Sequence, residues 1–157
     1  MIEHLLSHWM GLVHVLLALA ALLFGTLVLP FRKGDSRHRL LGRAYLISMV
    51  GLNLTALLNY ELFGYFGPFH WVALLSLASV LGGYVAVRRK SSGWKHRHAY
   101  FMAGSYVGLL AATVAEVASR VPSWPFGISV VVSSLLVILI GVVLMMRMLP
   151  GILKSRR

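Results

Sequence analysis

Residues 95–120 read KHRHAYFMAGSYVGLLAATVAEVASR, and the predicted architecture follows from this stretch. It is an apolar run with His98 near one end and Glu116 near the other. About 20 apolar residues suffice to cross a bilayer as an α-helix. Residues 98 and 116 then share one helix face and lie about 27 Å apart along the axis. Because an ionisable side chain inside a membrane helix is costly, Glu116 marks a candidate functional site.

Composition places the whole chain in a membrane. Of 157 residues, 59% are hydrophobic and 12% are charged, and the mean hydropathy is +0.81. A soluble domain carries about a quarter charged residues. We therefore expect a single transmembrane domain, residues 1–157. The absence of cysteine excludes disulfides and thiolate ligands. Residues 1–9 contain Glu3 and no Lys or Arg, which argues against a cleaved signal peptide.

Five apolar runs predict an all-α membrane protein with five transmembrane helices. Their expected bounds are about 5–29, 40–63, 69–87, 98–118 and 127–149. Each of the first four helices carries a histidine near an end or in its outer part, so we expect these four to form a histidine-bearing bundle. The fifth has no titratable residue before Arg147. We expect it to pack against the bundle, a second copy in a homo-oligomer, or a membrane partner.

The distribution of positive charge predicts the orientation. The net charge is +11, but fourteen of the fifteen Lys and Arg residues fall in basic segments 31–43 and 88–97, at the end of the fifth helix or in the tail. Only Arg120 lies elsewhere. Basic residues in short tracts between hydrophobic runs are typical of cytoplasmic loops, not of a nucleic-acid-binding surface. We expect the N-terminus outside, the C-terminus inside, and the bacterial inner membrane as the location.

The histidines predict two cofactor sites. His14 and His70 would form an outer pair, and His38 and His98 an inner pair. Imidazole is an axial ligand of haem iron, so two such pairs at opposite ends of a bundle predict two b-type haems and electron transfer across the membrane. Planar guanidinium groups could bind the haem propionates. The arginines that flank the inner pair are Arg39, Arg43 and Arg97.

Other hypotheses stay open at this point. His14, His70 and Glu116 could form a two-histidine, one-carboxylate site for zinc or copper at the outer face, in a binding, assembly or hydrolase-like protein. Glu116 and the histidines could instead be relay groups of a small transporter or proton pathway. The chain could also be a structural partner subunit. The sequence does not decide whether the protein is an enzyme.

Several of these residues also have purely structural interpretations. His14 could hydrogen-bond to a neighbouring helix, and Glu116 could pair with Arg120 four residues on. Gly104 and Gly108 form a GxxxG pattern, which favours close helix packing. Polar side chains of the second helix are expected to bond between helices; they are Asn53, Thr55 and Asn59.

Short motifs add a resemblance to a known family. Lys33-Gly34, His38-Arg39, Gly42 and Met49 match a KG…HR..G……M pattern. Phe69-His70 with Ser76-Leu77 matches FH…..SL, His98 with Met102 matches H…M, and His14 precedes Gly25. In this order the motifs resemble a family of small predicted bacterial membrane proteins of unknown function. The resemblance implies a compact helical membrane fold with signature histidines His14, His38, His70 and His98. More loosely, the arrangement is similar to dihaem b-type transmembrane cytochromes.

Overall fold

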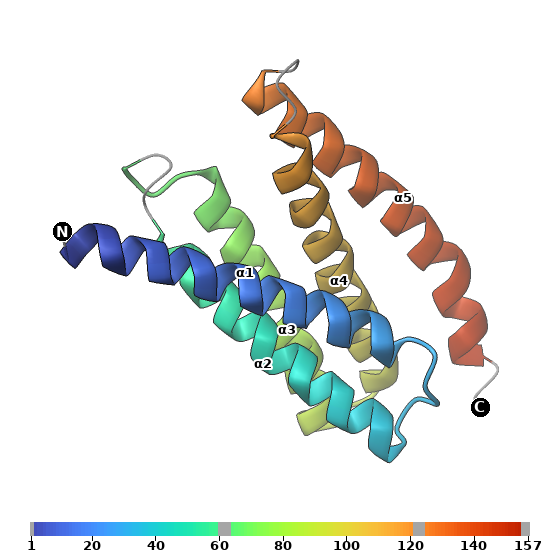
Figure 1. The fold of residues 1–157 in the computed structure, drawn as a ribbon. Helices are drawn as coiled ribbons and strands as arrows, with labels where there is room; N and C mark the ends of the chain where they lie inside the picture. The colour runs from blue at the N-terminus through green and yellow to red at the C-terminus, as the bar shows by residue number, and fades with distance from the viewer. Residues whose placement is uncertain (1, 60–63, 121–124, 155–157) are drawn as a thin grey trace. The chain divides into compact units, whose positions relative to one another are not determined.

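The computed structural model describes residues 2–59, 64–120 and 125–154, with the side chains of residues 2–8 left out. The described residues form five helices and no strand. The helices are α1 (Ile2–Val28), α2 (Ser36–Leu58), α3 (Pro68–Arg89), α4 (Trp94–Ala118) and α5 (Phe126–Lys154), in chain order in Figure 1. All five contain segments long and apolar enough to cross a membrane, by length and composition. The predicted all-α membrane fold with five spans is confirmed.

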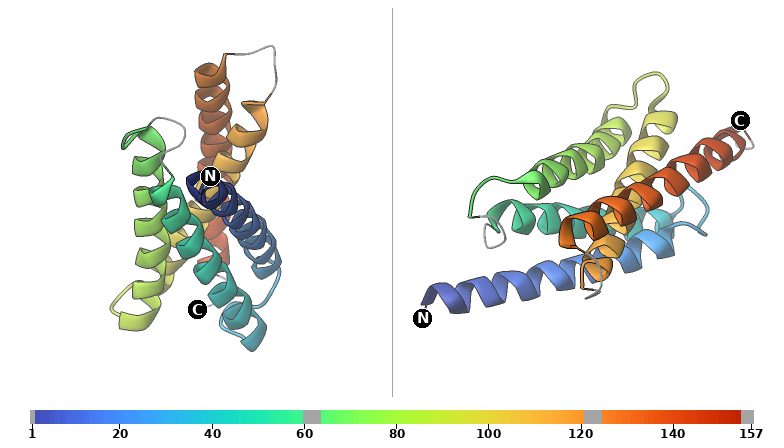
Figure 2. Two further views of the ribbon diagram at one scale, coloured as in Figure 1. Left: turned by 60° about the vertical axis from the view of Figure 1, so that its left-hand side comes forward. Right: turned by 90° about the horizontal axis from the view of Figure 1, so that it is seen from above.

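The chain divides into two compact units, Met1–Leu81 and Gly82–Arg157. The boundary falls within α3, so each unit holds part of this helix. In the first unit α1 and α2 lie side by side (Figures 1 and 2). In the second unit α4 packs along α5. The sequence predicted a single domain, and that expectation stays a prediction.

α2 and α4 begin earlier than the sequence suggested. The Asp35 carboxylate caps α2 by accepting hydrogen bonds from the backbone N–H groups of Arg37, at 2.5 Å, and His38, at 3.4 Å. A side-chain oxygen at this position satisfies donors that the first helical turn leaves open. α4 begins at Trp94, after Gly93 in a left-handed conformation with φ of 72°. His38 and His98 therefore lie within helices, because the basic segments contribute the first turns.

The other helix ends also differ from the expected bounds. α2 ends at Leu58, where Asn59 turns to an extended conformation with ψ of 107°. The expected end at residue 63 falls outside the described residues. α5 continues through Pro150 to Lys154, beyond the expected end at residue 149. Proline removes one backbone donor of a helix, yet α5 accommodates it within four residues of its end.

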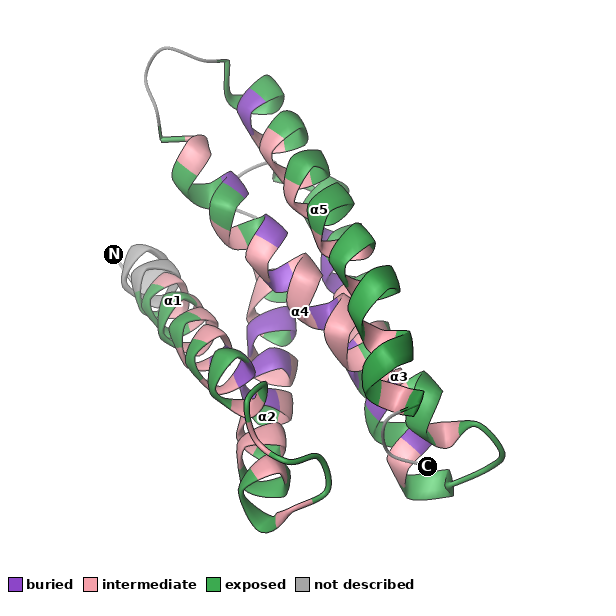
Figure 3. Cartoon of the chain, turned by 90° about the vertical axis from the view of Figure 1, so that its right-hand side faces the viewer, coloured by how far each residue is buried: buried purple, intermediate pink, exposed green. Residues whose placement is uncertain are grey.

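Close packing in the second unit depends on a glycine of α5. A methyl group at Gly141 would lie 2.5 Å from Val107 Cγ1 and 2.7 Å from its Cγ2. Only glycine lets the α5 backbone come this near the branched side chain on α4. The rest of α5 is mostly exposed along its length (Figure 3), and among its described residues Ser129 alone is buried. Apolar exposure of this kind is expected where lipid tails cover a helix.

Candidate histidine sites

His14 of α1 is hydrogen-bonded to α2. Its Nδ1 lies 2.9 Å from the hydroxyl oxygen of Thr55. That hydroxyl donates its own proton to the Leu52 carbonyl oxygen, at 2.8 Å. A hydroxyl has a single proton to give, so Thr55 accepts here and His14 Nδ1–H donates. In the neutral ring the lone pair therefore lies on Nε2. The expected structural bond from His14 to a neighbouring helix is present.

A glycine lets α1 and α2 approach beside this bond. A methyl group at Gly51 would lie 3.1 Å from Cδ1 of Leu17 and 3.2 Å from its Cδ2. Gly51 lies one turn before Thr55, and Leu17 lies about one turn after His14, so the two contacts are neighbours on the same helix pair. The close approach helps to bring the imidazole within hydrogen-bonding distance of the hydroxyl.

His98 of α4 is held in the same way by α3. Its Nδ1 lies 3.0 Å from the backbone carbonyl oxygen of Gly83. A carbonyl oxygen can only accept, so His98 Nδ1–H donates, and the lone pair of the neutral ring again lies on Nε2. A methyl group at Gly83 would lie 2.6 Å from Met102 Sδ and 2.9 Å from its Cγ. Gly83 therefore supplies the acceptor for His98 and the space for Met102, which lies one turn further along α4.

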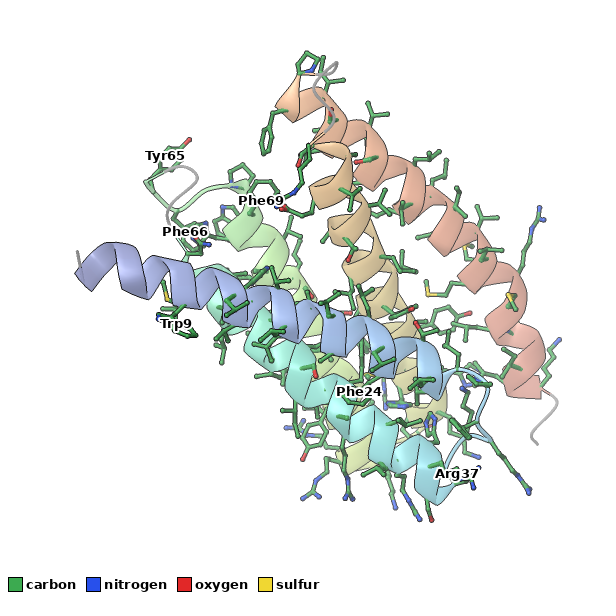
Figure 4. The ribbon with its side chains drawn as sticks, viewed as in Figure 1. Trp9, Phe24, Arg37, Tyr65, Phe66 and Phe69 are labelled. Carbon is green, nitrogen blue, oxygen red and sulfur yellow. The ribbon has the colours of Figure 1, made fainter. Side chains whose placement is uncertain are left out.

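His70 has the opposite hydrogen-bonding pattern. The backbone N–H of Gly67 donates to His70 Nδ1 at 3.1 Å, so the proton of the neutral ring lies on Nε2. Gly67 directly precedes α3 and His70 is its third residue, the position from which a side chain can reach back to the start of a helix. His70 is 3% exposed, and the Phe66 ring lies over its imidazole with centroids 4.7 Å apart. Phe66 precedes α3 in Figure 4. These contacts make His70 a helix-capping residue.

Glu116 pairs with Arg120, as the spacing predicted. A guanidinium nitrogen of Arg120 donates to the Glu116 carboxylate, and the side chains are 65% exposed for Glu116 and 75% for Arg120. Glu116 lies two residues before α4 ends at Ala118. The helix face shared with His98 is buried at Ser105 and exposed at Ala112 and Glu116. Glu116 is therefore a surface residue near a helix end in this structure.

The predicted propionate ligands lie in the first turns of their helices. Arg39 and Arg43 are exposed on α2. Arg97 is held by the preceding loop, because it donates to Ser91 Oγ at 2.6 Å and to the Ser92 carbonyl oxygen at 2.8 Å. His38, also on α2, is partly buried.

The predicted sites do not all fall within one unit. His14, His38 and His70 belong to the first unit, and His98 and Glu116 to the second. Within the described residues there is no cluster of three or more histidines and carboxylates able to hold a metal ion. The pairings of His38 with His98, and of His14 with His70 and Glu116, stay predictions.

Comparison with known proteins identifies the family. A profile described as "Predicted membrane protein (DUF2306)" matches residues 11–151. The chain belongs to this family. No curated protein and no solved structure matches the chain. The expected resemblance to a family of membrane proteins of unknown function is confirmed, and the looser similarity to dihaem cytochromes stays a prediction.

Two glycines of this DUF2306 member, Gly51 and Gly83, lie beside the hydrogen bonds of His14 and His98 and were not identified from the sequence. Gly51 and Gly83 lie inside apolar helices, where glycine costs about 1 kcal/mol relative to alanine. A glycine kept at that cost inside a helix usually has a packing reason. The Gly82-Gly83 pair in an otherwise apolar run was the available signal.

Proposed function

We propose that this protein is a membrane redox protein that holds b-type haem, with His14 and His98 as iron ligands in separate sites. The observation that carries the proposal is the shared state of these two side chains. Each donates Nδ1–H to a neighbouring helix, to Thr55 in one case and to Gly83 in the other. In a neutral ring this leaves the lone pair on Nε2.

That state is the one expected of a ligating histidine. A histidine that binds a metal usually donates its other ring N–H to a carbonyl, carboxylate or water, which fixes the tautomer and the ring orientation. The same bond makes the ligating nitrogen more basic. His14 and His98 have such bonds to polar groups on adjacent helices, and both are partly buried. This donor chemistry fits an axial ligand of haem iron.

His70 is assigned a different role. Its Nδ1 accepts from Gly67, so Nε2 carries the proton of the neutral ring. To bind iron through Nε2, the ring would first have to move this proton to Nδ1 and lose the bond from Gly67. The proposal therefore assigns His70 to the cap of α3. The predicted pairing of His14 with His70 is tested separately, by the haem content of His70→Gln.

Bound haem would supply one-electron transfer. The orientation we propose follows from the distribution of Lys and Arg: the N-terminus is outside and the basic end of the helices inside, in the bacterial inner membrane. His98 lies in the second turn of α4, at the basic end, and His14 lies twelve residues into α1. Two sites at different depths would suit electron transfer between the faces of the membrane.

The test is the haem content of single variants. We expect His14→Ala and His98→Ala each to remove part of the haem of the full chain purified in detergent. His96→Ala is the matched control, because His96 lies two residues from His98 and is exposed. It should keep the wild-type ratio of haem to protein. Equal haem in all four proteins would overturn the proposal.

The other hypotheses are distinct outcomes of the same experiment. Haem-free protein with stoichiometric zinc or copper would favour the metal site of His14, His70 and Glu116. Protein with neither haem nor metal, after expression with added haem precursor, would favour a transporter, a proton pathway or a partner subunit. The exposed ion pair of Glu116 with Arg120 gives the metal site less support than the bonds of His14 and His98 give to haem.

A further inference from the structure

The first two turns of α2 carry a hollow that the histidine sites leave unused. It has a volume of about 400 Å³, is open to the surroundings, and is lined by Ser36, Arg39, Leu40 and Arg43. These residues follow one another at helical spacing and so form one stripe along α2. Arg39, Leu40 and Arg43 are all exposed, Leu40 by 69%. The stripe thus combines two guanidinium groups with an apolar side chain.

Neighbouring arginines are engaged elsewhere. The Arg37 guanidinium lies 5.8 Å from the centroid of the Phe31 ring, at the distance of a cation–π contact. Arg37 marks this end of α2 in Figure 4. A second hollow, of about 460 Å³ on α4, has Arg97 in its lining. Arg97 is bonded to the loop residues Ser91 and Ser92. The hollow on α2 is therefore the better candidate for an external anion.

We propose that the Arg39–Arg43 stripe of α2 binds the headgroup of an anionic phospholipid, with Leu40 against the upper part of an acyl chain. The chemistry is bidentate recognition of phosphate oxygens by planar guanidinium groups. Asp35 is the nearest carboxylate in the sequence, and its oxygen is occupied by the backbone N–H groups that begin α2.

Position favours a lipid phosphate over a haem propionate. α2 is a candidate membrane span that begins at Ser36. Arg39 and Arg43 lie within about 10 Å of this end along the axis, the depth of headgroups and the adjoining part of the bilayer core. An exposed leucine beside two arginines at this depth matches an anionic lipid.

The experiment titrates the detergent-solubilised full chain with dioleoyl phosphatidylglycerol or dioleoyl phosphatidylcholine and counts bound lipid by native mass spectrometry. We expect wild type to prefer phosphatidylglycerol. Arg39→Gln with Arg43→Gln should reduce that preference by about 30-fold, since each basic side chain near an anionic lipid contributes roughly fivefold. Arg39→Lys with Arg43→Lys keeps both charges but not the planar guanidinium groups, so it should retain only part of the preference, between wild type and the glutamine double variant. Arg88→Gln with Arg89→Gln is the matched control, an exposed arginine pair at the end of α3.

Two results would overturn the assignment. If the two glutamine double variants lost the preference for phosphatidylglycerol equally, the overall charge of the protein, and not the Arg39–Arg43 stripe, would attract the lipid. Loss of haem in Arg39→Gln with Arg43→Gln, at unchanged lipid preference, would assign the arginines to propionates. Because the lipid readout does not depend on haem, failure of the haem proposal leaves this test intact. The helix content of each variant, measured by circular dichroism, checks that it is folded.

Discussion

His14 donates its Nδ1–H to the hydroxyl of Thr55 across the α1–α2 pair, at 2.9 Å. The equivalent bond in the second unit joins His98 to the Gly83 carbonyl, at 3.0 Å. A glycine contact accompanies each bond. Gly51 meets Leu17 about one turn from Thr55 and His14, and Gly83, which is itself the acceptor, meets Met102 one turn after His98. Two histidines in different helix pairs thus have the same tautomer for the same physical reason.

Replacing Thr55 tests the orienting bond. Thr55→Val keeps the shape and removes the acceptor, so His14 loses the group that fixes its Nδ1–H. We expect haem affinity at this site to fall by about 10- to 100-fold, as for other groups that orient a ligating histidine. Thr55→Ser keeps a hydroxyl and should restore most of the affinity. The measurement is haem transfer to an acceptor apoprotein, together with the midpoint potential.

A purely structural role for Thr55 predicts a different result. Hydrogen bonds between membrane helices contribute about 0.6 kcal/mol on average. If Thr55→Val lowered stability by that amount and left both haem affinity and potential unchanged, the assignment of Thr55 as a positioning residue would be wrong.

Gly141 tests the packing of α4 on α5. Gly141→Ala places a methyl group within 2.7 Å of both terminal carbons of Val107. Because a branched side chain has little freedom to move aside, we expect a loss of about 1–3 kcal/mol in unfolding free energy. Val107→Ala should restore much of it in the double variant. Unfolding in detergent and SDS mixtures measures both.

Gly108 on α4 is the matched control for Gly141. Among the described parts of the chain, a methyl group at Gly108 meets no atom within 4 Å. Gly108→Ala should therefore be neutral or stabilising by up to about 1 kcal/mol. The GxxxG pattern predicted close helix packing at Gly104 and Gly108. A large loss of unfolding free energy in Gly108→Ala would support that prediction.

Variants of His70 distinguish a helix-capping role from a role as an iron ligand. Glutamine at the third helical position can also reach back to the backbone N–H before the helix. We expect His70→Gln to keep stability close to wild type, and His70→Ala to lose about 0.5–2 kcal/mol, the usual effect of removing a cap. Both should keep the wild-type haem content. Haem loss in His70→Gln at normal stability would restore His70 as the partner of His14.

Replacing Glu116 should have little effect on stability or on haem and metal content. An exposed ion pair four residues apart contributes about 0.3–0.5 kcal/mol, so Glu116→Gln should change stability by no more than this. Haem, zinc and copper contents, measured by absorption and elemental analysis, should equal those of Arg120→Gln, which breaks the same pair. A metal content that fell in Glu116→Gln alone would favour the outer metal site.

The sequence predicted the five helices because each is an apolar run of spanning length. Helix starts were less well predicted: the Asp35 cap begins α2 at Ser36 and so places His38 and Arg39 inside the helix, whereas the expected start was at about residue 40. Thr55 was expected to bond between helices and does so, whereas Asn53 donates to Met49 of its own helix at 2.7 Å. The His14–Thr55 pairing itself was not predictable. Between Trp9 and Val28, α1 is apolar except at His14 and Thr26, so its sequence does not indicate which neighbouring helix the His14 face meets.

Haem binding by His14 and His98 is tested most directly by the absorption spectrum of the full chain, purified in detergent after expression with added haem precursor, before and after reduction with dithionite. We expect a Soret band, with α and β bands that sharpen on reduction, and a smaller Soret band in both His14→Ala and His98→Ala. Folded protein without a Soret band would contradict this expectation. The hydrogen bonds of His14 and His98 would then serve helix packing alone.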